Sequence, residues 1–112
     1  MNITLKQMKY FAALVEHGHF GRAASALAIS QPALSVQIRD LEAELGQPLF
    51  ERGPKGVQLT AFGGDFDTRA RAILEQIDDL GQFARAASDL SAGHQSTPLA
   101  SHLATIAELI RD

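Results

Sequence analysis

The segment from Phe20 to Arg39 constrains the fold of this chain more than any other stretch of the sequence. A short helix is predicted from about Phe20 to Ala28, and Ser30-Gln31-Pro32 has the residues that begin another helix almost at once. Two helices joined by a turn of about three residues must cross steeply, with a small residue at their closest approach. Ala24 is small enough, and apolar residues close the corner, namely Ala23, Leu27, Ile29, Leu34 and Ile38. The pattern predicts a helix-turn-helix over about residues 20–39.

Helices are also predicted on both sides of the turn. Thr4 is a good N-cap for a first helix that ends at Gly18. Its predicted inner face consists of Leu5, Met8, Phe11, Ala12 and Val15. The helix that Ser30 caps ends at Gly46 and has apolar residues at spacings of four, three and four, which are Leu34, Ile38, Leu41 and Leu45. These residues predict a small helical core.

A small β-hairpin and a long helix are expected next. Two short apolar runs over 49–52 and 57–59 flank Gly53-Pro54-Lys55-Gly56, a sequence typical of a tight turn. Thr60 can cap a helix that continues to about Leu90, on the order of 45 Å long. After a break at 93–98, apolar residues at helical spacing predict a last short helix, with Leu99, Leu103, Ile106 and Ile110 on one face.

The charges divide unevenly between the two halves of the chain. The 112 residues have a formal charge of −3. Residues 1–60 contain six basic and five acidic groups, whereas residues 61–112 contain four basic and eight acidic groups. The overall acidity therefore belongs to the second half, and the first half is nearly neutral. This division leaves a nucleic-acid partner open for residues 1–60.

Several classes of protein are excluded by what the sequence lacks. It contains no cysteine, which rules out disulfides, thiol nucleophiles and cysteine-based metal centres. His17 and His19 form an H-x-H pair, and His94 and His102 lie near the end, but no acidic cluster with metal spacing accompanies them. There is no glycine-rich phosphate loop. We therefore expect no enzyme activity, no metal site and no cofactor.

The sequence also has no membrane signal. No apolar run approaches the roughly 18 residues of a membrane span. The first residues, Met1 to Lys6, lack the apolar core of a signal peptide. We expect no membrane partner and a cytoplasmic location.

A seven-residue repeat runs along the predicted long helix. One row consists of Phe66, Ile73, Leu80 and Ala87, and a second row four residues later consists of Ala70, Ile77 and Ala84. Alternating spacings of four and three form the seam of a coiled coil. The simplest partner for such a stripe is a second copy of the same helix. These seven residues are the predicted dimerisation residues; the alternative is a single helix folded across its own domain.

Residues 3–90 resemble the N-terminal part of LysR-type transcriptional regulators. The resemblance rests on motifs in register, which are Leu5-x-x-Met8-x-x-Phe11, Ala23-Ala24-x-x-Leu27, Ser30-Gln31-Pro32-Ala33-Leu34-Ser35, Leu41-Glu42-x-x-Leu45-Gly46, Leu49-Phe50-x-Arg52 and Leu59-Thr60-x-x-Gly63. It implies a mainly α fold, with a winged helix-turn-helix over 1–60 (wing about 49–59) and a dimerisation helix over 61–92. It further implies a homodimer or higher homo-oligomer that regulates transcription from double-stranded DNA with a roughly palindromic operator.

Candidate DNA-binding residues lie on the third helix and on the wing. If the third helix enters the major groove, its N-terminal turns must use the side away from the core. Gln31, Pro32, Ser35, Val36 and Arg39 satisfy this condition. Lys55 at the hairpin tip is a candidate for the minor groove or the flanking backbone, and Arg52 is expected to brace the wing or bind a phosphate. Arg22 and Ser30 are further candidates, and Ser30 is also the predicted helix cap.

Three residues depart from the pattern of the family. Val36 stands where many members have a basic or polar residue, which indicates a different preferred base. Ala28 occupies a turn position where Gly is common, so the turn either avoids the left-handed region or accepts a small cost. His19 replaces the usual hydroxyl residue and is predicted to cap the second helix.

The end of the chain leaves alternatives open. Regulators of this family continue into a longer α/β domain that binds a small-molecule effector. Residues 93–112 are therefore expected to pack on the dimer or to begin such a domain, in a fragment or in a naturally short form. An effector is expected only if a longer form exists. Two other classes remain: a winged domain of the molybdate-responsive type, and a dimerising protein that binds no DNA.

Overall fold

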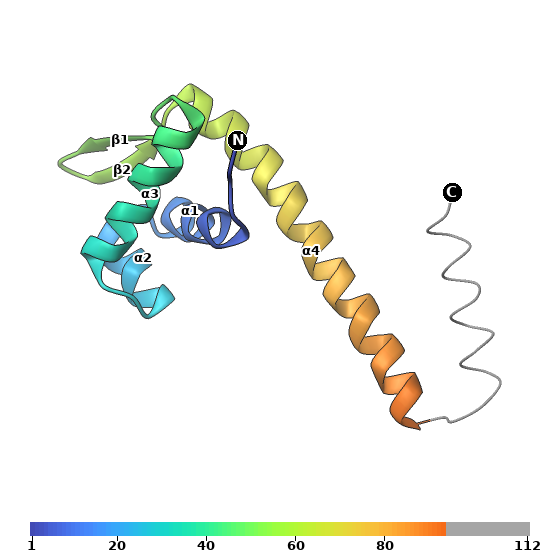
Figure 1. Cartoon of the computed structure of the whole chain (residues 1–112). Helices are drawn as coiled ribbons and strands as arrows, with labels where there is room; N and C mark the ends of the chain where they lie inside the picture. Colours follow the sequence, from blue (N-terminus) through green and yellow to red (C-terminus); the bar gives the residue numbers. More distant parts are fainter. Residues whose placement is uncertain (94–112) are drawn as a thin grey trace. The chain divides into compact units, whose positions relative to one another are not determined.

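The structure is a computed structural model that describes the backbone of residues 1–93 and the side chains of residues 1–90. The predicted last helix lies outside the described residues. By its internal contacts the chain divides into two units, residues 1–75 and residues 76–112. The described elements are shown in Figure 1 and are α1 (Leu5–His17), α2 (Phe20–Leu27), α3 (Gln31–Leu45), β1 (Phe50–Gly53), β2 (Gly56–Leu59) and α4 (Ala61–Gly93). Three helices, a hairpin and a long helix confirm the predicted mainly α fold.

Local capping explains where the first helices begin and end. Thr4 and Gln7 form a capping box, in which the Thr4 side chain accepts a hydrogen bond from the Gln7 amide and the Gln7 side chain accepts one from the Thr4 amide, both at 3.0 Å. Gly18 ends α1 with φ 66°, and Gly46 ends α3 with φ 75°. Glycine adopts this left-handed conformation without a steric penalty, so both predicted stops are confirmed.

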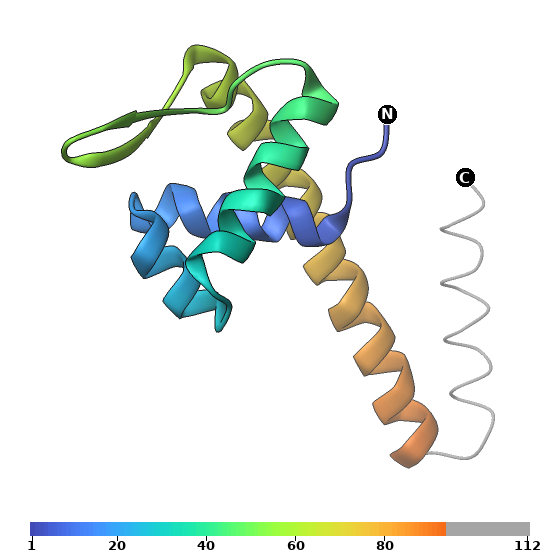
Figure 2. The ribbon, with the colours of Figure 1, turned by 60° about the vertical axis from the view of Figure 1, so that its left-hand side comes forward.

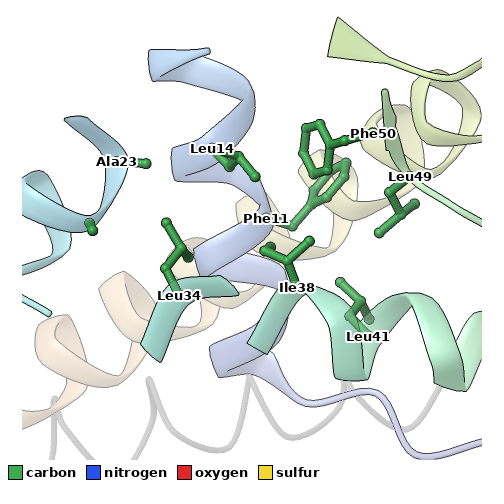
Figure 3. Close-up of a cluster of buried hydrophobic side chains, with 9 residues drawn as sticks. Phe11, Leu14, Ala23, Leu34, Ile38, Leu41, Leu49 and Phe50 are labelled. Atoms are coloured by element: carbon green, nitrogen blue, oxygen red, sulfur yellow. The ribbon is translucent and has the colours of Figure 1, made fainter. Parts of the chain in front are cut away.

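The core of the first unit lies where α1, α2 and α3 meet the start of the hairpin (Figure 3). Its buried residues are Phe11, Leu14, Ala23, Ala24, Leu34, Ile38, Leu41, Leu49 and Phe50. The rings of Phe11 and Phe50 lie 5.3 Å apart between centroids. Leu45 is half-buried and packs against this cluster, so the predicted inner face of α3 is confirmed.

The predicted inner face of α1 needs a correction. The fully buried residues of this helix are Phe11 and Leu14, whereas Leu5, Met8, Ala12 and Val15 are only partly buried. Leu14 was not among the predicted residues. A helix buries a stripe, and residues three apart such as Phe11 and Leu14 form its centre when α2 and α3 pack on that side.

The hairpin is antiparallel and pairs Phe50 with Leu59 and Arg52 with Val57. The two predicted turn glycines form the last pair of the ladder, so that only Pro54 and Lys55 remain in the loop. The Val57 amide donates a 3.1 Å hydrogen bond to the carbonyl of Gly18, in the turn between α1 and α2. Figure 2 shows the hairpin extending from the end of α3 toward that turn.

Gly56 explains why the hairpin can dock there. Its φ is 113°, and a Cβ built on it would lie 2.4 Å from the Gly18 carbonyl oxygen. Only glycine satisfies both the conformation and the space. The hairpin is therefore fixed to the α1–α2 turn through its backbone.

Close contacts also fix the first turn of α4 to the segment that precedes β1. The Thr60 hydroxyl accepts a hydrogen bond from the Gly63 amide at 2.9 Å and donates one to the Pro48 carbonyl at 2.8 Å. A Cβ on Gly63 would lie 2.1 Å from the Leu49 carbonyl oxygen. The predicted cap at Thr60 is confirmed, and Gly63 is required because the two backbones approach so closely.

Glu42 joins α3 to the hairpin. One of its carboxylate oxygens accepts hydrogen bonds from the amides of Leu49, at 2.6 Å, and Phe50, at 3.3 Å. Such charge-assisted bonds hold the segment between α3 and β1 in place.

The described residues contain neither a membrane-spanning helix nor a cluster of metal ligands. None of their helices is long and apolar enough to cross a membrane. No group of three or more His, Cys, Asp or Glu side chains within this part of the chain is arranged to hold a metal ion.

Candidate nucleic-acid interface

The turn between α2 and α3 brings the two helices together over small side chains. Ala23 and Ala24 are both buried, and the Ile29 amide donates a 3.0 Å hydrogen bond to the Ala24 carbonyl. Ala28 has φ 58° and ψ 40°, in the left-handed region. Of the two alternatives for Ala28, the structure shows the second: the turn accepts a non-glycine residue in a conformation that alanine disfavours.

Cap residues fix the start of both helices of the motif. The Ser30 hydroxyl accepts a hydrogen bond from the Ala33 amide at 3.2 Å, and Pro32 lies in the first turn of α3. His19 Nδ1 accepts a hydrogen bond from the Gly21 amide at 3.2 Å. Both predicted caps are confirmed, and the orientation of α3 is set before any ligand binds.

The N-terminal half of α3 presents the predicted DNA-reading residues on its outer side. Gln31, Pro32 and Arg39 are exposed, Val36 is 47% exposed, and Ser35 is half-buried. Leu34, Ile38 and Leu41 occupy the opposite, buried side. The five predicted residues of α3 therefore lie together on the face that the core leaves free.

The hairpin adds two cations near this face. Lys55 is exposed in the two-residue loop at the tip, as predicted. Arg52 lies with its guanidinium carbon 4.6 Å from the centroid of the Phe20 ring. A shallow hollow lies beside the contact between Arg52 and Phe20. The residues that line it include His19, Phe20, Gln31 and Arg52. The wing and the start of α3 thus border the same surface.

The cations of this surface are free of ion pairs within the described part of the chain. Arg22, Arg39, Arg52 and Lys55 are all exposed, and none of them forms a salt bridge there. The salt bridge that the described residues contain joins Arg71 to Asp67 at 3.0 Å on α4, and its hydrogen bond raises the pKa of Arg71. A cation that has no ion pair among the described residues can meet a phosphate without first breaking an ion pair there.

The seven predicted dimerisation residues divide into two groups. Phe66 lies edge-on to Phe11, with ring centroids 5.0 Å apart, and Ala70 is buried. Ile73, Ile77 and Leu80 are 42%, 39% and 61% exposed, Ala84 is exposed and Ala87 is half-buried. The first two residues are therefore already covered within the first unit, and the free part of the seam begins at Ile73.

Sequence reasoning missed two contacts and one exposed residue of this interface and its surroundings. The Arg52–Phe20 contact, the double acceptance by Glu42 and the exposed Phe83 of α4, 37% exposed, were not predicted. Arg52 and Phe20 lie far apart in the sequence, so no local spacing indicates their contact. For Phe83 a signal was present, because it directly precedes the seam residue Ala84.

The helix-turn-helix part of the chain matches a known family of regulators. The family model described as bacterial regulatory helix-turn-helix protein, lysR family, matches residues 5–64. The chain belongs to the LysR family. Its relatives include the SDS degradation transcriptional activation protein of Pseudomonas sp. (strain ATCC 19151), 47% identical over 87 residues, and the HTH-type transcriptional regulator YnfL of Escherichia coli (strain K12), 49% identical over 79 residues.

These relatives are much longer than the match. The aligned regions cover 69% and 70% of this chain but only 28% and 27% of the two relatives. What is similar is therefore a part of these relatives that includes the helix-turn-helix, somewhat more than a quarter of their length. Membership in this family confirms the predicted resemblance to LysR-type regulators.

Solved structures of LysR proteins have the same fold. The CbnR_DBD–DNA complex superposes with a TM-score of 0.71 at 43% identity, covering 77% of this chain and 99% of that chain. The complex of BenM_DBD with catB site 1 DNA gives 0.74 at 38% identity, covering 77% and 97%. The predicted winged helix-turn-helix followed by a long helix is confirmed by these structures.

Proposed function

We propose that this chain binds DNA sequence-specifically as a homodimer and regulates transcription from a roughly palindromic operator in the bacterial cytoplasm, at the nucleoid. The observation that carries the proposal is the outer side of α3, where the side chains that can reach base edges lie beside a hairpin whose cations form no ion pair among the described residues. The DNA complexes of CbnR_DBD and BenM_DBD, which share this fold, support it.

Each residue of the α3 face has a defined chemical role in this proposal. The side-chain amide of Gln31 can pair bidentately with adenine, and Arg39 can bind guanine or a phosphate. Pro32 and Val36 can contact a thymine methyl group, whereas the half-buried Ser35 can donate to a base or a phosphate. With Val36 47% exposed and apolar, this position is expected to select thymine by contact and not by hydrogen bonding.

The remaining candidates act on the DNA backbone. Lys55 at the hairpin tip serves the minor groove or the flanking phosphates, and Arg52 and Arg22 serve phosphates. Ser30 contributes mainly by capping, since its hydroxyl accepts the hydrogen bond of the Ala33 amide. Pro32 has no amide proton, so the Gln31 backbone amide is the one that this turn leaves for an anion. Because residues 1–60 contain six basic groups against five acidic ones, we expect modest affinity per subunit and a strong dependence on salt.

Dimerisation through α4 compensates for the modest affinity of each subunit for its half-site. The seam residues Ile73, Ile77 and Leu80 are exposed apolar side chains with coiled-coil spacing, and a second copy presents the matching stripe. Ala84 and Ala87 extend the seam, whereas Phe66 and Ala70 support it from within the first unit. Two half-sites bound by one dimer act at high effective concentration. A small-molecule effector is not assigned to this chain.

Selection of DNA ligands from a random library, followed by binding measurements on variants, tests the proposal. Gln31→Ala should weaken binding to the selected duplex by about 1–3 kcal/mol and relax the preference at one base position. Gln47→Ala changes an exposed glutamine beyond the end of α3 and serves as the matched control, with binding unchanged. Footprinting should show two protected half-sites.

Two outcomes would contradict the proposal. Failure to select any duplex, together with unchanged behaviour of Gln31→Ala and Ser35→Ala, would favour a dimerising protein that binds no DNA. Protection of one isolated half-site would refute the dimer.

A further inference from the structure

The contact between Arg52 and Phe20 joins the wing to the first residue of α2. The guanidinium carbon lies 4.6 Å from the ring centroid, within the range of a cation–π interaction. Phe20 is partly buried and packs against the core, so its ring is held in place from behind. The exposed Arg52 thus rests on a fixed aromatic surface.

The register of the hairpin explains why Arg52 points to this ring. Side chains alternate along a strand, so Arg52 lies on the same face of the hairpin as Phe50, which is buried in the core. Its cross-strand partner Val57 donates its amide to the Gly18 carbonyl at 3.1 Å, two residues before Phe20. The backbone on both sides of the contact is therefore fixed, and the position of the guanidinium follows from the docking of the hairpin.

The guanidinium lies over the ring, and none of its N–H groups forms a hydrogen bond within the described residues, so they stay available to a ligand. No carboxylate of the described residues lies within ion-pair distance of Arg52. The neighbouring hollow is open on one side and is also bordered by Gln31 and His19. Since His19 Nδ1 accepts the Gly21 amide, the neutral ring has its proton on Nε2 and adds another donor. A hollow bordered by such donors suits a phosphate oxygen.

We propose that Phe20 is a positioning residue for DNA binding, which holds the Arg52 guanidinium so that its N–H edge meets a backbone phosphate at the hollow beside Gln31. The inference rests on the proposed function and adds how one phosphate contact is built. A free arginine loses much rotamer freedom when it binds a phosphate. An arginine already stacked on a ring loses less, so the contact gains affinity by preorganisation.

A double-mutant cycle on the full chain, with fluorescence anisotropy on a duplex selected by the wild type, tests this. Phe20→Leu should raise Kd by about two- to fivefold, the factor expected from one exposed cation–π contact. Phe20→Tyr keeps the ring face and should bind like the wild type. In the Arg52→Ala background, Phe20→Leu should have no further effect. Arg52→Ala itself should reduce the slope of log K against log salt by about 0.9, the value for one phosphate.

Thermal unfolding of each variant separates positioning from folding. Phe20→Met is the second variant if Phe20→Leu does not fold, because it fills similar volume without an aromatic face. Equal losses of affinity in the wild-type and Arg52→Ala backgrounds would overturn the inference. So would wild-type binding by Arg52→Ala, although the proposed function would then stand. If the wild type selects no duplex at all, the proposed function fails first.

Discussion

Two stretches of α4 follow one seven-residue repeat but differ in what covers them. Phe66 and Ala70 are covered within the first unit, where Phe66 meets the ring of Phe11. Ile73, Ile77 and Leu80 continue the same spacing with 42%, 39% and 61% of their surface exposed. The difference shows that one repeat serves two purposes along a single helix, first completing a core and then presenting an apolar stripe.

The two stretches of α4 contribute to stability in different ways. The core residues of the first unit are buried by their own chain, so their contribution does not depend on protein concentration. The described residues leave the rest of the seam exposed. Its burial by a second copy, as proposed, would make its contribution depend on protein concentration.

The largest expected effect comes from a matched pair of leucine truncations. Leu14→Ala removes a fully buried side chain and should lower the free energy of unfolding by about 2–5 kcal/mol at every protein concentration. Leu80→Ala removes a side chain that is 61% exposed and should change mainly how Tm varies with concentration. Calorimetry at several dilutions measures both. A concentration-independent loss of several kcal/mol for Leu80→Ala would contradict burial by a second copy.

A smaller effect is expected when a charge is placed on the seam. Leu80→Glu should give monomers in sedimentation experiments and weaken binding to a two-site operator on the order of 100-fold, because two half-sites are no longer joined. Gln82→Glu introduces the same carboxylate two residues further on, at an exposed position away from the seam, and should leave both properties unchanged. If both variants remain dimeric with wild-type affinity, α4 is not the dimer interface.

The smallest expected effect concerns the left-handed residues of the first unit. Ala28→Gly should raise the free energy of unfolding by up to about 1 kcal/mol, because alanine at φ 58° is strained and glycine is not. Gly46→Ala makes the reverse substitution at another left-handed residue and serves as the control. Its φ is 75° with open space around the site, so it should cost about 1 kcal/mol through backbone strain alone. Denaturant titration resolves both, and a loss of stability in Ala28→Gly would show that chain entropy dominates at this turn.

The helices could be predicted because their boundaries are local. Thr4, Ser30 and Thr60 lie within three residues of the amides that they cap, and Gly18 and Gly46 end helices through their own conformation. The same holds for the α3 face, since the spacing of Leu34, Ile38 and Leu41 defines the side that stays free.

The contacts between elements could not be predicted in this way. The ring of Phe20 meets Arg52 only because the hairpin docks on Gly18, and that docking depends on a backbone approach at Gly56. The seven-residue repeat likewise gives no sign of which of its residues the same chain covers. Phe66 and Ile73 occupy equivalent positions in the sequence, and only the presence of Phe11 distinguishes them.

The close approach of Gly63 to the Leu49 carbonyl has a consequence for building chimeras. Thr60 and Gly63 belong to the wing as much as to the helix, because one bonds to Pro48 and the other leaves no room for a side chain. A fusion junction placed before Thr60 would discard the cap that starts α4. A junction placed after Ala70 would retain Phe62 and Phe66, which pack against the core, and the buried Ala70. A transplantable form of this module therefore extends at least ten residues beyond the hairpin, through two to three turns of α4.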